Sequence, residues 1–354
     1  MSARSDRSPS RRPGFAFAAL CAAIACMLAA IAPAQARGGI VSDTQIKAAV
    51  DKAYAATKGI TAGKDADYIP ALAEVPPDLF GIAVVTVDGR IYTVGDTDHP
   101  FAIESASKPF AASWVIEQKG EQWVEDTIGV NQTGLPFNSI IALESHAQAT
   151  PAMNPLVNAG AIAIVSWIEP AEPEARWQTI QQLMNDYAGR ALDVDLTVYR
   201  SEAGSSEHNR AISRLLKGYG TLDGDPEVAL DLYTRQCSIH VTARDLAAMG
   251  ATLANGGTHP ITGKKVVSPA AAEKTMAIMS TTGLYETSGT WTWNVGLPAK
   301  SGVGGGIVAV APGRFAIATF APPLDAAGNS VKGQKAIELI VRELIGNGMF
   351  DTGR

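Results

Sequence analysis

The stretch that decides how the chain folds is Ser105-Ala106-Ser107-Lys108, at the start of a predicted helix. Residues three apart on a helix share a face, so the Lys108 amine can reach the Ser105 hydroxyl. Burial disfavours the ammonium form of a lysine, and the neutral amine can then take the serine proton and leave a nucleophile. The pattern therefore predicts serine nucleophilic catalysis, although a helix cap with a solvated lysine also fits these four residues.

A second motif, Lys300-Ser301-Gly302, precedes a predicted strand near the C-terminus. Serine acyltransfer enzymes of the penicillin-recognising type carry K-T-G or K-S-G at this place. The glycines on either side of Val303 have no Cβ, so the backbone can approach a substrate there, and the Val303 N–H can join that of Ser105 in an oxyanion hole. The glycines alone also fit a flexible turn. Two motifs in this order favour acyl transfer.

The elements around these motifs predict an α+β fold. The predicted strands are 81–87, 90–94, 305–311 and 314–320, and the predicted helices are 42–59, 105–118, 155–167, 177–187, 207–217, 226–233, 242–254, 268–279 and 332–345. Asp88-Gly89 is a strong hairpin signal between the first two strands. Because tight turns join consecutive strands, we expect an antiparallel sheet with flanking helices and a helical domain beside it.

The N-terminal segment has the pattern of a signal peptide. Four arginines precede an apolar run over residues 15–31, and Ala34-Gln35-Ala36 offers small residues for cleavage. We expect a signal peptide over 1–36, export to the periplasm, and no membrane contact after cleavage. A membrane anchor is the alternative, but the run is at the lower edge of what spans a bilayer. The twin-arginine export route stays open beside the Sec route.

Composition excludes several classes of protein. The chain has 29 Lys+Arg against 35 Asp+Glu, for a net charge of −6, and no basic cluster in its body, so we expect no nucleic-acid partner. With 46% hydrophobic and 18% charged residues it can build a core. Two of its three cysteines, Cys21 and Cys26, lie in the leader, which leaves Cys237 alone. The cysteines and histidines show no metal-ligand spacing, so we expect no metal site.

Longer strings point to a family. They are Gly63–Ala73 (GKDADYIPALA), Phe101–Lys108 (FAIESASK), Gly134–Ser139 (GLPFNS), Asn154–Ala161 (NPLVNAGA) and Gly296–Gly306 (GLPAKSGVGGG). They resemble the serine-dependent glutaminase family, from about residue 43 to about 345. The resemblance implies a β-lactamase/penicillin-binding-like fold and hydrolysis of L-glutamine to L-glutamate and ammonia, without metal or organic cofactor. It also implies a homodimer or homotetramer.

The resemblance further implies a role for each site residue. Ser105 matches the nucleophile, Lys108 its general base, and Tyr233 a tyrosine that assists proton transfer. The residues that match substrate contacts are Tyr68, Ser105, Asn158, Glu202, Asn209, Tyr233, Tyr285 and Val303. Glutamine is a zwitterion with an amide tail, so Glu202 suits its ammonium, the two asparagines its carboxylate, and the N–H groups of Ser105 and Val303 its amide oxygen. From the residues alone, Glu202 also fits a surface carboxylate, and each asparagine a helix cap.

The resemblance predicts the domain bounds, and the sequence differs from the family pattern at two places. We expect residues 37–354 to form the glutaminase domain, with a sheet subdomain over about 37–104 and 280–354 and a helical subdomain over about 105–279. Glu104 stands where the family usually has glutamine, which puts another carboxyl group beside the nucleophile and can alter affinity or pH optimum. The segment Thr290-Trp291-Thr292-Trp293-Asn294 also differs from the family pattern.

Other functions fit parts of the sequence. A penicillin-binding or β-lactamase-type acyl hydrolase carries the same two motifs. A threonine-type asparaginase would need a Thr-Gly-Gly-Thr loop near the mature N-terminus, which the sequence lacks. A non-catalytic glutamine-binding protein would need parallel sheets in two lobes, whereas the strands here are joined by hairpins. Cys237 as a nucleophile has no histidine or asparagine partner that the sequence places beside it.

Overall fold

The structure is a computed structural model that describes residues 41–146, 150 and 152–352; the signal peptide predicted over 1–36 lies outside the described residues. Its main feature is a five-stranded antiparallel sheet in the order β2-β1-β7-β6-β5. The strands are β1 (Gly81–Thr86), β2 (Ile91–Gly95), β5 (Ala299–Ser301), β6 (Gly306–Ala311) and β7 (Phe315–Phe320). A two-stranded sheet pairs β3 (Phe101–Ala102) with β4 (His240–Val241). The predicted antiparallel sheet is confirmed.

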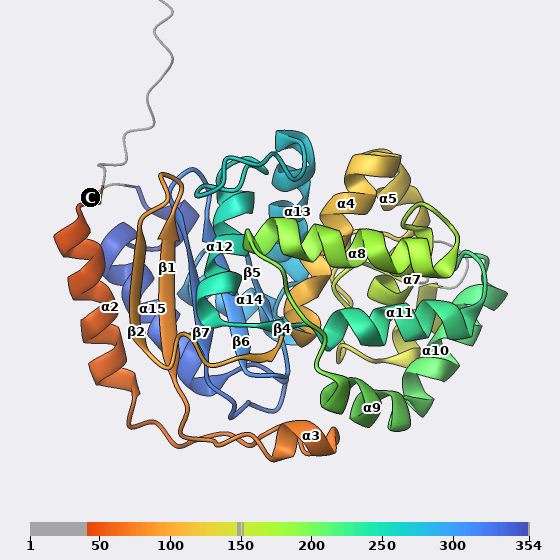
Figure 1. The fold of residues 1–354 in the computed structure, drawn as a ribbon, viewed down its shortest axis with the longest axis horizontal. Coiled ribbons are helices and arrows are strands. Elements are labelled where there is room, and N and C mark those ends of the chain that lie inside the picture. The colour runs from red at the N-terminus through yellow and green to blue at the C-terminus, as the bar shows by residue number, and fades with distance from the viewer. Residues whose placement is uncertain (1–40, 147–149, 151, 353–354) are drawn as a thin grey trace, which may run out of the picture. The chain divides into compact units, whose positions relative to one another are not determined.

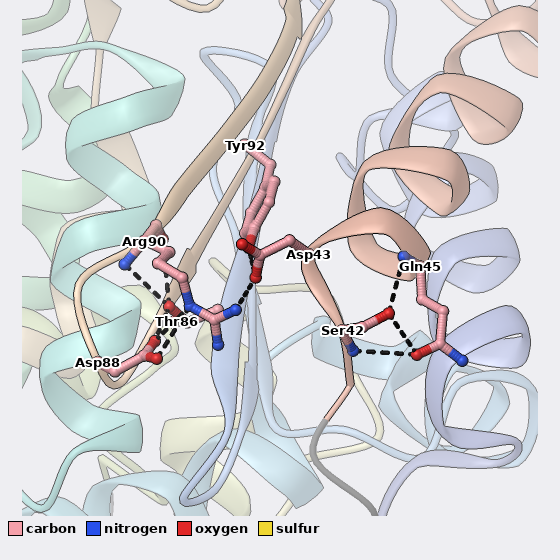
Figure 2. A network of polar contacts seen from close by, with 7 residues as sticks. All are labelled: Ser42, Asp43, Gln45, Thr86, Asp88, Arg90 and Tyr92. Atoms are coloured by element: carbon pink, nitrogen blue, oxygen red, sulfur yellow. Dashed lines mark hydrogen bonds and ion pairs between the residues drawn. The ribbon is translucent and has the colours of Figure 1, made fainter.

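The hairpin of β1 and β2 turns at Asp88-Gly89 as predicted, with Gly89 at φ 86°. Its turn is tied to the start of α2 (Asp43–Thr57), as Figure 2 shows: the Tyr92 hydroxyl donates to Asp43 Oδ1 at 2.8 Å, and Arg90 pairs with Asp43 and Asp88. The predicted capping box is also present (Figure 2), because the Ser42 N–H donates to Gln45 Oε1 at 3.0 Å. These contacts fix the first helix against the sheet edge.

Alternating residues of the strands enter two different cores. In β1, Ile82 and Val84 join the core that α2 and α15 (Val331–Ile345) cover, whereas Ala83 and Val85 face the opposite side. Figure 1 shows α12 (Ala243–Ala254) against that opposite side. Both faces of the central strands are therefore buried, which explains why these strands are apolar except for the buried Thr86 and Thr319.

Helix α12 lies within the segment 105–279 that the sequence assigns to the helical subdomain, yet it packs on the sheet. Gly250 allows this approach: a Cβ there would lie 2.5 Å from Val308 Cγ2 and 2.8 Å from Ala316 Cβ. The sheet thus carries helices on both faces, and α12 separates it from the rest of the helical segment.

Most of the remaining helices form a block beside the sheet (Figure 1), whereas α14 (Ser288–Asn294) contributes Trp291 to the sheet core and the 3₁₀ turn η3 (Gly348–Phe350) contacts α15. The other remaining helices are α3 (Pro70–Ala73), α4 (Lys108–Lys119), α5 (Glu121–Thr127), α6 (Ile140–His146), α7 (Asn158–Trp167), α8 (Pro173–Ala188), α9 (Leu196–Gly204), α10 (Glu207–Gly218), α11 (Pro226–Cys237) and α13 (Pro269–Thr282), with short 3₁₀ turns η1 (Glu104–Ser107) and η2 (Tyr285–Thr287). Helix α7 is almost wholly buried and contacts α4, α10 and α11. None of the helices in the described part of the chain has the length and apolar character needed to cross a membrane.

Two helices begin later than the sequence predicts. The helix expected from Ser105 starts as the 3₁₀ turn η1 and becomes α-helical at Lys108. The helix expected from Pro155 starts at Asn158, because the Asn154 side chain accepts hydrogen bonds from the N–H groups of Leu156 and Val157 and holds a turn there. Both corrections fall at residues that line the site described below.

Gly160 allows α7 to pass close to this Asn154 turn, since a Cβ at Gly160 would lie 1.7 Å from the Asn154 carbonyl oxygen. We expect Gly160→Ala to lower the free energy of unfolding by about 2–3 kcal/mol, because backbone must move to admit the methyl group. Urea unfolding measures this. Gly218→Ala in α10 is the matched control, since nothing lies within 4 Å of its Cβ. Equal losses in the two variants would contradict the explanation.

Candidate active site

Ser105 and Lys108 lie where the 3₁₀ turn η1 enters α4, directly after β3. Both side chains are buried, with 6% and 1% of their surface exposed. Ser105 lines a cavity of about 120 Å³, together with six of the seven other predicted substrate contacts. These lining residues are Tyr68, Ile69, Glu104, Ser105, Phe137, Asn138, Asn158, Glu202, Ser205, Ser206, His208, Asn209, Tyr233 and Val303.

Lys108 is held beneath this cavity by Asn158, the first residue of α7. Its Nζ donates to Asn158 Oδ1 at 2.7 Å, and the Tyr233 hydroxyl donates to the same oxygen at 3.2 Å. The sequence predicts that Lys108 reaches Ser105, but its hydrogen bond in this structure goes to Asn158 instead. Burial lowers the pKa of Lys108 to about 8, although the neighbouring Cys237, Glu202 and Glu104 oppose the shift.

Tyr233 lies in α11 and is 2% exposed. Burial raises the pKa of its phenol well above the usual value, and the acidic neighbours Cys237 and Glu202 raise it further. The hydroxyl therefore keeps its proton at neutral pH. Lys108, with its pKa lowered to about 8, is the group of the two that has a neutral, proton-accepting fraction near neutral pH, whereas Tyr233 still holds a proton that it can donate.

Asn209, from α10, lies next to Asn158 across the cavity. Asn158 Nδ2 donates to Asn209 Oδ1 at 3.0 Å. The asparagine pair therefore links three helices, α7, α10 and, through Tyr233, α11. The sequence analysis assigns both asparagines to the substrate carboxylate, but nothing in their local sequence shows that they hydrogen-bond to each other.

Glu202, from α9, and Glu104, from η1, both line the cavity. Burial raises the pKa of both carboxyl groups, and the charge of Glu202 raises that of Glu104 further, whereas Lys108 lowers both. Among the described residues, Glu202 Oε2 has no hydrogen-bond partner. A buried carboxyl oxygen without a partner is available to a ligand.

Val303 lies in the glycine-rich loop between β5 and β6, which rests on the backbone just before Ser105. A Cβ on Gly304 would lie 2.4 Å from the Ala102 carbonyl oxygen, and one on Gly302 would lie 2.7 Å from that of Ile103. Within the described residues, neither the Ser105 N–H nor the Val303 N–H donates a hydrogen bond. Two unpaired N–H groups beside a nucleophile are what an oxyanion hole requires.

Tyr285 is the predicted contact that does not line the cavity; it lies behind it. Its backbone has φ 56°, its ring packs on Phe137 with centroids 5.0 Å apart, and Lys300 Nζ lies 3.9 Å from its ring centroid. Lys300 is fully buried and donates to the Ser301 carbonyl oxygen at 2.6 Å. The K-S-G motif thus supports Tyr285, which carries a hydroxyl that Ser105 and Ser301 approach.

Tyr68 lies at the rim of the cavity and is 53% exposed. Its loop is fixed at both ends: the Lys64 N–H donates to the Leu324 carbonyl oxygen at 2.9 Å, and the Ala71 N–H donates to Ser201 Oγ at 3.2 Å. Sequence reasoning missed six further lining residues, Phe137, Asn138, Ile69, Ser205, Ser206 and His208. The Gly134–Ser139 string contained the first two, but nothing in it assigned them a role.

Glu104, Glu202 and Cys237 are the group in the described residues with the mutual spacing of metal ligands, within 4.8 Å. Burial raises the pKa of the Cys237 thiol well above its usual value, so the thiol stays protonated. The buried Lys108 amine also faces these acids. A protonated thiol beside a lysine is a poor metal ligand, and we assign no metal to the group.

The model of the family described as glutaminase matches residues 63–348. The glutaminase of Colwellia psychrerythraea is 50% identical over 302 residues, which are 85% of this chain and 96% of the relative. That of Brucella canis is 51% identical over 311 residues, 88% of this chain and 97% of the relative. The chain belongs to the glutaminase family.

Solved structures agree with this assignment to the glutaminases. A probable glutaminase, ybaS, superposes with a TM-score of 0.85 at 46% identity, over 88% of this chain and 99% of that one. A probable glutaminase of Bacillus subtilis superposes with a TM-score of 0.77 at 30% identity, over 86% and 96% of the two chains. The predicted β-lactamase-like α+β fold and the amidohydrolase class are confirmed, whereas the roles of individual residues stay predictions.

Proposed function

We propose that the chain hydrolyses the side-chain amide of L-glutamine through an acyl-enzyme on Ser105. The observation that carries this proposal is the convergence at one cavity of a buried serine, two unpaired backbone N–H groups and a lysine whose pKa is lowered to about 8. Each is a requirement of acyl transfer by a serine nucleophile. The family membership supplies the substrate class.

Lys108 takes the Ser105 proton, and the serine oxygen attacks the amide carbon. The N–H groups of Ser105 and Val303 stabilise the oxyanion that forms. Tyr233 then protonates the departing nitrogen and regains a proton from the Lys108 ammonium, so both groups return to their starting protonation states. Ammonia leaves, and water hydrolyses the γ-glutamyl ester on Ser105 to give glutamate and the free serine. For the first step, Lys108 must exchange its bond to Asn158 for one to Ser105; catalytic hydrogen bonds often tighten only when substrate is present.

The amino-acid end of glutamine fits the other side of the cavity. Its ammonium group meets Glu202 Oε2, which has no protein partner. Its carboxylate meets the amide groups of Asn158 and Asn209. Tyr68 covers the entrance from its loop. Each charged or polar group of the substrate thus has a complementary hydrogen-bonding or charged group in the cavity, as a small polar ligand requires.

Ammonia release from a panel of amino-acid amides tests the proposed function. We expect rapid release from L-glutamine and much slower release from amides that lack the α-amino group or the carboxylate, since these lose the Glu202 or asparagine contacts. Hydrolysis of nitrocefin, a chromogenic β-lactam, is the comparison. Rapid nitrocefin hydrolysis without ammonia release from glutamine would contradict the proposal and favour a β-lactamase.

We also propose that residues 1–36 direct export to the periplasm and that the mature chain forms a dimer or tetramer. The leader pattern supports the first part, and the family resemblance supports the second. N-terminal sequencing of the periplasmic protein should show that the mature chain begins at Arg37.

For the oligomeric state, light scattering of the mature protein should give the mass of two or four chains. A cytoplasmic, uncleaved protein or a monomer would contradict the respective part.

A further inference from the structure

Glu104 and Glu202 face the same part of the cavity. They are 2% and 8% exposed, and one carboxyl oxygen of each lies within 4.8 Å of the other. Neither Glu104 Oε1 nor Glu202 Oε2 has a hydrogen-bond partner among the described residues. Two buried carboxyl groups that open on one cavity without partners are arranged to receive a ligand.

The backbone holds the Glu104 side chain in this position. Glu104 has φ 51°, in the left-handed region that residues other than glycine rarely adopt. The facing loop makes room for it: a Cβ on Gly302 would lie 3.3 Å from Glu104 Cβ, and one on Gly304 would lie 3.3 Å from Glu104 Cγ. Such strain persists where the surrounding structure enforces it, and it clusters at functional sites.

The spacing of the two carboxyl groups suits a nitrogen between them. Two oxygens that accept hydrogen bonds of ordinary length from one tetrahedral ammonium lie about 4.7 Å apart. If a protonated carboxyl group donated a hydrogen bond directly to a carboxylate, their two oxygens would lie about 2.6 Å apart. In the described residues the two oxygens lie within 4.8 Å of each other and no hydrogen bond joins Glu104 to Glu202, so the pair leaves room for the first arrangement.

The charges around the pair disfavour two carboxylates in the empty cavity. The ionisable groups that face it are Lys108 from α4, Tyr233 and Cys237 from α11, Tyr285 from η2, Tyr68 from its loop and His208 from α10. Lys300 lies behind Tyr285 and next to Lys108. Burial keeps the thiol and the phenols neutral, so Lys108 is the nearest cation. Two buried carboxylates would exceed the charge that it can balance.

We propose that Glu104 carries a proton in the empty enzyme and releases it when the α-ammonium group of glutamine enters between Glu104 and Glu202. The O–H bond of Glu104 breaks, its proton passes to the buffer, and the resulting carboxylate accepts a hydrogen bond from the ammonium. Glu104 is then a substrate contact beside Glu202. This inference rests on the proposed function, since it takes glutamine as the ligand.

Titration calorimetry of glutamine into the Ser105→Ala protein tests the inference, because that variant binds without turnover. The experiment is run at neutral pH in two buffers of different ionisation enthalpy, so that the heats give the protons released. We expect up to about one proton per bound glutamine, and binding that tightens as the pH rises. In Ser105→Ala/Glu104→Gln, the release should fall close to zero and affinity should drop on the order of tenfold.

Ser105→Ala/Glu343→Gln, altered at an exposed glutamate of α15, is the control and should release protons like the parent. Equal release in the Glu104 and Glu343 variants would overturn the inference. If the Glu104 variant does not fold, absence of proton release in the parent alone would overturn it. The proposed function is tested separately by ammonia release from the unmutated enzyme, so the inference can fail while glutaminase activity stands.

Discussion

Ser105→Ala should abolish ammonia release from L-glutamine, with a loss in kcat on the order of 10⁴-fold or more. The serine supplies the atom to which the γ-glutamyl group is transferred, and the residual rate comes only from binding and the oxyanion hole. A coupled ammonia assay measures the loss. Glutamine should still bind, because Glu202 and the asparagine pair do not depend on the hydroxyl.

The fold of this variant should be unchanged, because the Ser105 hydroxyl interacts with the Tyr285 hydroxyl, and Tyr285 is also held by the packing of its ring on Phe137. Thermal unfolding and the far-ultraviolet circular dichroism spectrum check this. Ser280→Ala, in α13 and away from the cavity, controls for loss of a serine hydroxyl and should keep full activity. Substantial turnover by a folded Ser105→Ala protein would rule out the serine nucleophile.

Lys108→Met should lower kcat on the order of 10³-fold, because it removes the base that deprotonates Ser105. Lys108→Arg should be about as inactive, since a guanidinium keeps its proton and cannot act as a base. The comparison separates proton transfer from charge: if the positive charge alone mattered, arginine would restore much of the rate. Steady-state kinetics with L-glutamine provide both values.

The pH dependence of the unmutated enzyme provides a second test of Lys108 as the general base. The pKa of Lys108 is lowered to about 8, so the fraction of neutral amine grows as the pH rises through that value. We therefore expect kcat/KM to increase with pH and level off above about pH 8, and this limb should be absent from the residual activity of Lys108→Arg. An activity that falls through the same range would contradict Lys108 as the base.

Much of the fold follows from local signals. The capping box at Ser42, the Asp88-Gly89 turn and the apolar runs of β6 and β7 each depend on neighbouring residues, so the sequence predicts them. The three-residue strand β5 and the two-residue strands β3 and β4 are too short to leave a pattern. Their existence depends on partners far along the chain, which pair with them only in the folded protein.

The residues of the site also fall into two groups, those that the sequence predicts and those whose contacts form only in the folded protein. The S-x-x-K and K-S-G motifs predict catalysis by a serine and a lysine. The resemblance to the family predicts most of the other residues of the site. The contacts that set proton affinities join different helices: Lys108 with Asn158, Asn158 with Asn209, and Glu104 with Glu202. Burial and spacing across elements determine these pairs, and neither property can be read from residue order. In the sequence, Glu104 is distinguished only by standing where the family usually has glutamine.

The central claim is that a γ-glutamyl group is held on Ser105 during turnover. Mixing enzyme with saturating L-glutamine, quenching with acid in the steady state, and mapping peptides by mass spectrometry tests it most directly. We expect a mass increase of one γ-glutamyl group on the peptide that contains Ser105, and none in Ser105→Ala. An adduct on the Cys237 peptide, or the same adduct in the Ser105→Ala protein, would contradict the account.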